Sequence, residues 1–150
     1  MAKLNSRTKK ENGSALVLIA ILIPLFFLIT GFVIDIGRAF IIREELNKAC
    51  MIAAEEASKH IEIDAAEEYG TNILSGGYGD IIQEFFYSNF PERDNFRINY
   101  LHHSISGGID NPKYIEVNCE GEADCFFLRL ISIQKIKIHS TAMGRLRRIK

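Results

Sequence analysis

The sequence is dominated by one apolar run, residues 14–34, which reads SALVLIAILIPLFFLITGFVI. No charged side chain occurs between Asn12 and Ile34. A helix formed by these 23 uncharged residues is about 35 Å long, which exceeds a bilayer hydrocarbon core of about 30 Å. The run is apolar on every face, so a soluble domain could bury it only with many partner helices. Pro24 removes one backbone hydrogen bond near its middle, a defect that spanning helices tolerate. We therefore predict a transmembrane helix over residues 14–34.

The composition of the whole chain limits what else it can be. Its 150 residues leave room for one modest domain beside the helix. The formal net charge is -1, and such a charge does not indicate a nucleic-acid-binding protein. Three cysteines are too few for a disulfide-dense scaffold. The charge and the cysteine count therefore disfavour a nucleic-acid partner and a disulfide-dense mini-protein.

The charges on either side of the apolar run predict its orientation. Four basic residues precede the run, namely Lys3, Arg7, Lys9 and Lys10. The cations on the far side are offset by acidic neighbours, so the N-terminus is expected in the cytoplasm. A cleavable secretory signal is disfavoured because the run is long and no small-x-small site precedes a break. We expect a basic cytoplasmic leader at 1–13 and an extracytoplasmic head with a helical stalk at 35–150, in a single-pass protein of the cell membrane.

The helical pattern continues beyond the membrane as one apolar stripe. The stripe recurs at spacings of three and four residues and consists of Ala39, Ile42, Leu46, Ala49, Ala53 and Ala57. The pattern predicts one continuous helix from Ser14 to about Lys59. Small alanine side chains allow another backbone or a sheet to approach closely. Packing of the stripe within its own domain is favoured over a helix–helix seam between subunits.

The rest of the chain predicts shorter helices followed by a small sheet. Helical patterns cover Asp64 to Ser75 and Asp80 to Phe90. Beyond Pro91 the apolar period changes to two, which is typical of strands. Three strand faces are expected, carrying Phe96, Ile98 and Tyr100, then Ile115, Val117 and Cys119, and finally Ile136 and Ile138. A bulky apolar crossover, Cys125 to Ile133, precedes the third strand. The predicted fold is α+β, a long N-terminal helix packed on a small antiparallel sheet.

No constellation in the sequence indicates catalysis or a bound cofactor. A nucleophile elbow, a phosphate-binding loop and an HExxH motif are all absent from the sequence. His102 and His103 are neighbours on a strand, so their side chains point to opposite faces and do not readily share one metal ion. We expect no catalytic residue, no metal or cofactor site and no small-molecule substrate, and therefore no enzyme.

Two cysteines near the crossover leave alternatives open. Cys119 and Cys125 flank a segment with three carboxylates. A local disulfide fits an extracytoplasmic location, and two unpaired thiols fit almost as well. A metal site is disfavoured because the spacing differs from that of structural zinc sites. Cys50 lies on the helical stripe and is expected to fill space in the core.

The N-terminal third resembles a known family, the TadE/TadG-like minor pilins of the tight-adherence (Flp-type) pilus assembly system. The resemblance extends from Glu11 to about Ala57. It is carried by a basic leader, Gly13, an apolar span interrupted by Pro24, and the sequence Asp-Ile-Gly-Arg at residues 35–38, followed by an alanine-rich helix. It implies a pilin-like fold and a place among pilus-assembly proteins.

One departure from the pilin pattern concerns processing. Pilins that a prepilin peptidase cleaves have a glycine followed by an apolar run with glutamate at its fifth position, whereas this chain has Leu18 there. The resemblance marks the bond between Gly13 and Ser14 as the cleavage point, and Leu18 argues against cleavage and against use as a repeating filament subunit. The prepilin peptidase is nevertheless a partner that the resemblance implies.

The resemblance implies a function as a membrane-anchored minor pseudopilin. Its partners would be the lipid bilayer and other pilin-like or pilus-machinery membrane proteins. Gly31, Asp35, Gly37 and Arg38 are the expected membrane-boundary and assembly contacts, with Asp35 in a hydrated position. A simpler interpretation treats Asp35 and Arg38 only as a boundary pair. The alternative function is an uncleaved bitopic protein whose head binds a cell-wall or surface partner.

Overall fold

The structure is a computed structural model that describes residues 5–60, 62, 74, 76–107 and 113–146, with the backbone alone described for residues 5–12. The chain divides into two compact units. The first unit comprises Met1–Gly37 and Cys125–Gln134, and the second comprises Arg38–Asp124 and Lys135–Lys150. The expected helix at Asp64 to Ser75 lies outside the described residues, apart from Leu74.

Helix α1, Asn5–Lys59, contributes to both units. It ends at Lys59, which confirms the predicted end of the stalk, but it begins nine residues before the predicted Ser14. The leader before Gly13 contains no proline, so nothing in it interrupts the backbone hydrogen bonds of the helix. Among the described residues, α1 is the one helix long and apolar enough to span a membrane.

Helix α3, Tyr78–Asn89, lies in the second unit. It confirms the predicted helix at Asp80 to Phe90, shifted by one or two residues. Ile82 and Phe86 are its buried positions, and Phe90, directly after the helix, is buried too. The Phe86 and Phe90 rings lie 6.1 Å apart, and the Phe90 ring meets that of Phe96 edge-on at 5.4 Å. These contacts join α3 to the first strand.

The sheet contains β1 (Phe96–Ser106), β2 (Tyr114–Asp124) and β3 (Lys135–Arg145). The three strands are antiparallel, as the sequence predicts, and their order in the sheet is β1-β2-β3. One strand prediction is wrong: Tyr100 does not share the buried face with Phe96 and Ile98. The β1–β2 register shifts between Ile98 and Tyr100, and this bulge turns Tyr100 outward, where it is 53% exposed.

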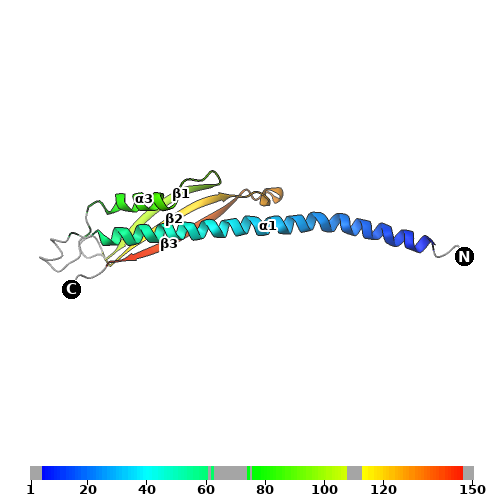
Figure 1. Cartoon of the computed structure of the whole chain (residues 1–150), viewed down its shortest axis with the longest axis horizontal. Helices are drawn as coiled ribbons and strands as arrows, with labels where there is room; N and C mark the ends of the chain where they lie inside the picture. The colour runs from blue at the N-terminus through cyan, green and yellow to red at the C-terminus, as the bar shows by residue number, and fades with distance from the viewer. Residues whose placement is uncertain (1–4, 61, 63–73, 75, 108–112, 147–150) are drawn as a thin grey trace. The chain divides into compact units, whose positions relative to one another are not determined.

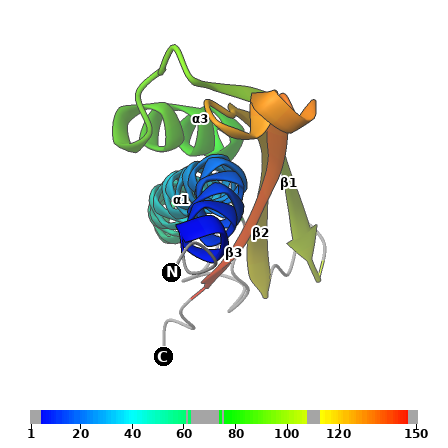
Figure 2. The same ribbon diagram turned by 90° about the vertical axis from the view of Figure 1, so that its right-hand side faces the viewer.

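The hydrophobic core of the second unit lies between the helices and one face of the sheet. Figure 2 shows α3 and the second half of α1 on the same side of the sheet, and Figure 1 shows them alongside the strands. The helical stripe is buried in this core, with Leu46, Ala49, Ala53 and Ala57 fully inaccessible. Its packing within its own domain therefore matches the favoured prediction.

A close backbone contact explains why the stripe is rich in alanine. At Gly144 of β3, an added Cβ would overlap the carbonyl group of Ala54 in α1. Side chains larger than alanine on the stripe would hold the strand and the helix apart. Nearby, the Ser140 hydroxyl donates a hydrogen bond to Asn47 Oδ1 at 3.2 Å.

Candidate functional site

The most specific polar arrangement in the first unit surrounds Asp35. Asp35 is 3% exposed, and its carboxylate accepts hydrogen bonds from three consecutive backbone N–H groups. Oδ1 lies 3.0 Å from the nitrogen of Phe126, and Oδ2 lies 2.9 Å and 2.8 Å from the nitrogens of Phe127 and Leu128. Hydrogen bonds to a charged acceptor are stronger than neutral ones, so three of them compensate the burial of this charge. We name this arrangement the Asp35 anchor.

The segment that Asp35 holds is a compact connection, Cys125–Gln134, which contains the 3-10 helix η1 (Leu128–Ile131). The amide of Cys125 donates to the carbonyl of Gln134 at 2.9 Å, which closes the segment at its base. Inside it, the amide of Ile133 donates to the carbonyl of Leu128 at 3.0 Å. Ser132 adopts a left-handed conformation with φ 69°, which ends η1. We name this connection the apolar loop.

Gly31 provides the second contact between α1 and the apolar loop. An ideal Cβ on Gly31 would lie 2.5 Å from Cβ of Phe127, so only glycine lets the Phe127 side chain pack there. Gly31 and Asp35 are one helical turn apart on α1 and therefore lie on the same face. Gly31 leaves space for the Phe127 side chain, and the Asp35 carboxylate accepts a hydrogen bond from the Phe127 backbone N–H.

The four predicted membrane-boundary and assembly residues differ in burial: Asp35 and Gly31 are buried, Arg38 is partly buried and Gly37 is exposed. Asp35 was expected in a hydrated position, but it is buried against its own chain, because backbone amides of the apolar loop replace water. Gly31 is likewise used within the chain. Gly37, in contrast, is exposed, with no atom near the position of an added Cβ. Arg38 is partly buried.

Gly13 and Ser14 are exposed and lie inside α1. The bond between them is therefore part of a continuous helix. The use of Gly13, Ser14, Gly37 and Arg38 in processing or assembly stays a prediction.

Sequence reasoning did not find the partner of Asp35. The amides of Phe126, Phe127 and Leu128 are more than 90 positions away along the chain. Backbone amides also have no residue signature. The available signal was the concentration of bulky apolar side chains in the crossover, which marked the segment as unusual without showing what it contacts.

The three cysteines are thiols in the structure, and all are buried. Cys119 on β2 makes a side-chain hydrogen bond with Cys50 on α1, and that bond, together with burial, raises the pKa of the Cys119 thiol. Cys119 thus has a partner within the second unit, which the sequence did not indicate. Cys125 belongs to the first unit. The disulfide between Cys119 and Cys125 is not formed in the structure, and its formation in the cell stays a prediction.

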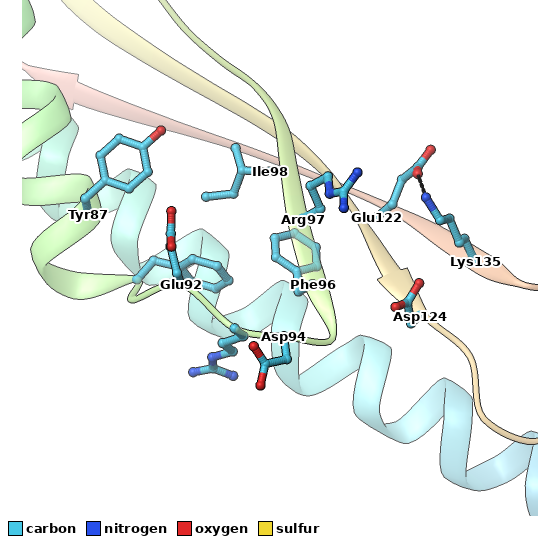
Figure 3. Close-up of a pocket in the computed structure, with 11 residues that line it drawn as sticks. Tyr87, Glu92, Asp94, Phe96, Arg97, Ile98, Glu122, Asp124 and Lys135 are labelled. Carbon is cyan, nitrogen blue, oxygen red and sulfur yellow. Dashed lines mark hydrogen bonds and ion pairs between the residues drawn. The ribbon is translucent and has the colours of Figure 1, made fainter.

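A groove of about 770 Å³ lies in the second unit, beside β1 and the edge of α3. Figure 3 shows charged side chains of both signs around it. They are Glu92, Arg93, Asp94, Arg97, Glu122, Asp124 and Lys135. Lys135 Nζ lies 2.8 Å from Glu122 Oε2, and this hydrogen bond and charge lower the pKa of Glu122. Phe96 and Ile98, which the sequence predicts as strand residues, line this groove, but none of the predicted site residues does. Among the described residues, no cluster of three or more His, Cys, Asp or Glu could hold a metal ion.

Comparison with models of known protein families gives a match for part of the chain. Neither the curated proteins nor the solved structures yield one. The match is to a family model and covers the segment that contains Gly31, Asp35 and most of the alanine stripe. Residues 13–55 match the TadE-like protein family, which confirms the predicted TadE/TadG-like resemblance over this part of the chain.

Proposed function

We propose that this protein is a membrane-anchored, TadE/TadG-like minor pseudopilin that takes part in assembly of a tight-adherence pilus or a related surface structure. The observation that carries the proposal is the family match over residues 13–55. The matched segment coincides with the part of α1 that is long and apolar enough to span a bilayer. The proposal assigns no catalytic activity to the chain. Its N-terminus lies in the cytoplasm and its second unit lies outside, as the flanking charges favour.

The geometry narrows the surfaces that could contact other assembly proteins. The alanine stripe is buried in the second unit, and Gly31 is filled by Phe127, so neither is available to a neighbouring helix. The exposed face of α1 remains, with Val33 63% and Phe40 58% exposed around Gly37. A small residue between bulky apolar ones allows a second membrane helix to approach closely. We assign lateral recruitment to this face.

In-cell photocrosslinking in the native host tests this function. A photoreactive phenylalanine analogue is placed at Val33 or Phe40 on α1, and at Tyr100 on β1 as the matched control. The proposal expects covalent products with pilus-machinery or pilin-like membrane proteins from the α1 positions. Deletion of the protein should also reduce the number of pili. Wild-type piliation in the deletion strain, with no pilus protein captured from any position, would refute the assignment.

A second candidate function rests on the charged groove of the second unit. Its mixture of Arg97, Lys135 and several carboxylates suits a zwitterionic wall polymer or a charged protein surface. This is the bitopic surface-binding alternative. Sedimentation with purified cell wall distinguishes it, since Arg97→Ala combined with Lys135→Ala should reduce wall binding and leave piliation unchanged. Equal sedimentation of the double variant and the wild-type chain would exclude the groove as the binding site.

A further inference from the structure

We propose that the apolar loop, Cys125–Gln134, is a second membrane contact that inserts into the bilayer leaflet on the Asp35 side. This inference rests on the membrane anchoring in the proposed function and adds a lipid-binding site to it. Two parts of one compact unit would then share the same lipid: the apolar run of α1, and a loop that the chain reaches about 90 residues later.

The surface of the apolar loop is unusual for a segment in water. Five large apolar side chains are exposed on it, Phe126 at 58%, Phe127 at 43%, Leu130 at 79%, Ile131 at 45% and Ile133 at 43%, beside the exposed polar residues Arg129, Ser132 and Gln134. Contiguous exposed patches of this kind mark membrane or protein contacts. In the same unit, every large apolar side chain of α1 from Leu16 to Ile34 is exposed as well. The loop therefore extends an apolar surface that already requires lipid.

The contacts with α1 place the apolar loop at the depth of the membrane. Asp35 directly follows the apolar run, and its carboxylate holds the loop backbone there. Phe127 packs on Gly31, which lies about 6 Å closer to the middle of the run at 1.5 Å of rise per residue. Gly31 is within the uncharged stretch. The Phe127 side chain thus lies beside a part of α1 that the bilayer would surround.

The polar groups of the apolar loop suit an interfacial position. Backbone N–H groups that enter lipid need internal partners. Asp35 accepts three of them, and carbonyls within the loop accept those of Cys125, Leu130, Ser132 and Ile133. Arg129 is the one charged residue between Cys125 and Gln134, and it is exposed. An arginine at this position can extend its guanidinium to the phosphates while its stem stays among the acyl chains.

The chain contains no tryptophan, so single tryptophan variants report the environment of one position at a time. The full chain is reconstituted in phosphatidylcholine vesicles, with and without bromine on the acyl chains, placed both near the headgroup and deeper in the bilayer. Leu130→Trp reports the apolar loop and replaces a 79% exposed side chain. Phe27→Trp reports the apolar run of α1. Tyr100→Trp, at an exposed position of β1, is the matched control in the second unit.

Brominated lipid is expected to reduce the emission of Leu130→Trp about twofold, with a blue-shifted maximum, and to leave Tyr100→Trp unchanged. Phe27→Trp separates the two proposals. If Phe27→Trp is quenched and Leu130→Trp is not, the anchor holds and the loop inference is wrong. If Phe27→Trp itself is unquenched, the membrane anchoring fails. A blue-shifted Leu130→Trp without quenching would mean that protein covers the loop, which also overturns the inference.

Discussion

At the scale of single residues, Asp35 and Gly31 connect α1 to the apolar loop. Asp35 does so through its carboxylate, and Gly31 does so by leaving space for a side chain of the loop. A carboxylate at the end of an apolar run is costly unless it is hydrated or hydrogen-bonded. Asp35 is buried and hydrogen-bonded to three amides of the apolar loop. Gly31 supplies the space for Phe127 one turn away. Asp35 thus has an intramolecular role, which does not require a partner protein.

Asp35→Ala is predicted to release the apolar loop from α1. Three N–H groups would lose their acceptor, that of Leu128 buried and those of Phe126 and Phe127 part-buried. An unsatisfied buried donor costs about 1–3 kcal/mol. We expect amide exchange of Phe127 and Leu128 to accelerate roughly 100-fold or more, because the loop opens locally while the rest of the fold persists. Hydrogen–deuterium exchange of the vesicle-bound chain measures these amide exchange rates.

The control for this variant is Thr30→Ala on the same helix. The Thr30 hydroxyl donates a hydrogen bond to the carbonyl of Phe26 at 2.9 Å, within α1 itself. Exchange of residues 126–128 should be unchanged in Thr30→Ala. Equal exchange rates in Asp35→Ala and the wild-type chain would contradict the anchoring role.

His103 is predicted to make the second unit less stable as the pH falls. Burial, and to a smaller extent the neighbouring His102, lower the pKa of His103. Its ring meets that of Tyr78 edge-on at 5.4 Å. In the unfolded chain the pKa returns to about 6.5, so the unfolded state binds the proton first as the pH falls through that value. The free energy of unfolding should therefore be constant above about pH 7 and decrease between about pH 6.5 and 5.

Urea unfolding of the full chain in detergent micelles, followed by circular dichroism from pH 5 to 8, measures this dependence. His103→Gln should flatten the profile in the acidic range. His60→Gln, at an exposed position just after α1, is the matched control and should keep the wild-type slope. An unchanged slope in His103→Gln would assign the acid sensitivity to other groups.

At the scale of elements, local sequence patterns predicted the helices and strands. They did not predict the contacts between segments that are distant in the chain. The stripe on α1 and the period of two in β2 follow from periodic burial, so both are readable from the sequence. The bulge in β1 inserts one residue without a visible signal, so the exposure of Tyr100 was missed. The Asp35 anchor and the contact between Cys119 and Cys50 join residues far apart in the chain, and no local pattern encodes such pairs.

The approach of β3 to α1 provides a prediction at this scale. Gly144→Ala adds a methyl group that would overlap the carbonyl group of Ala54. Backbone cannot rotate away as a side-chain end can, so β3 or α1 must shift, and overpacking of this kind costs about 1–3 kcal/mol. We expect a lower midpoint of urea unfolding.

Gly37→Ala is the matched control for Gly144→Ala. Its Cβ would meet open space on the surface of α1. Replacing glycine by alanine inside a helix stabilises by up to about 1 kcal/mol, so the midpoint should stay or rise. If Gly144→Ala unfolds at the same urea concentration as the wild-type chain, the close helix–strand contact is not present in solution.

At the scale of the whole molecule, the chain uses its apolar side chains for two purposes. Those of the second unit form a closed core of helix, helix and sheet. Those of the first unit, on α1 and on the apolar loop, stay exposed and require lipid in the proposed function. The alanine stripe lies in the closed core, so a neighbour in an assembly would meet the exposed surface of α1 instead. An anchored accessory role fits this division better than that of a repeating filament subunit, which packs its helix among copies of itself.

The last prediction follows from that distinction and concerns the N-terminus in the native membrane. We expect the chain to keep residues 1–13, for two reasons. Leu18 occupies the fifth position after Gly13, where cleaved pilins carry glutamate, and the bond between Gly13 and Ser14 lies inside the continuous helix α1. A peptidase needs an extended backbone at the bond it cuts, so the helix would have to unwind there.

Mass spectrometry of the membrane-extracted N-terminal peptide measures whether residues 1–13 are kept. Leu18→Glu provides the comparison and should increase cleavage if this glutamate guides the peptidase. A wild-type chain that starts at Ser14 would show that the peptidase accepts Leu18, and the protein would then be able to enter a filament.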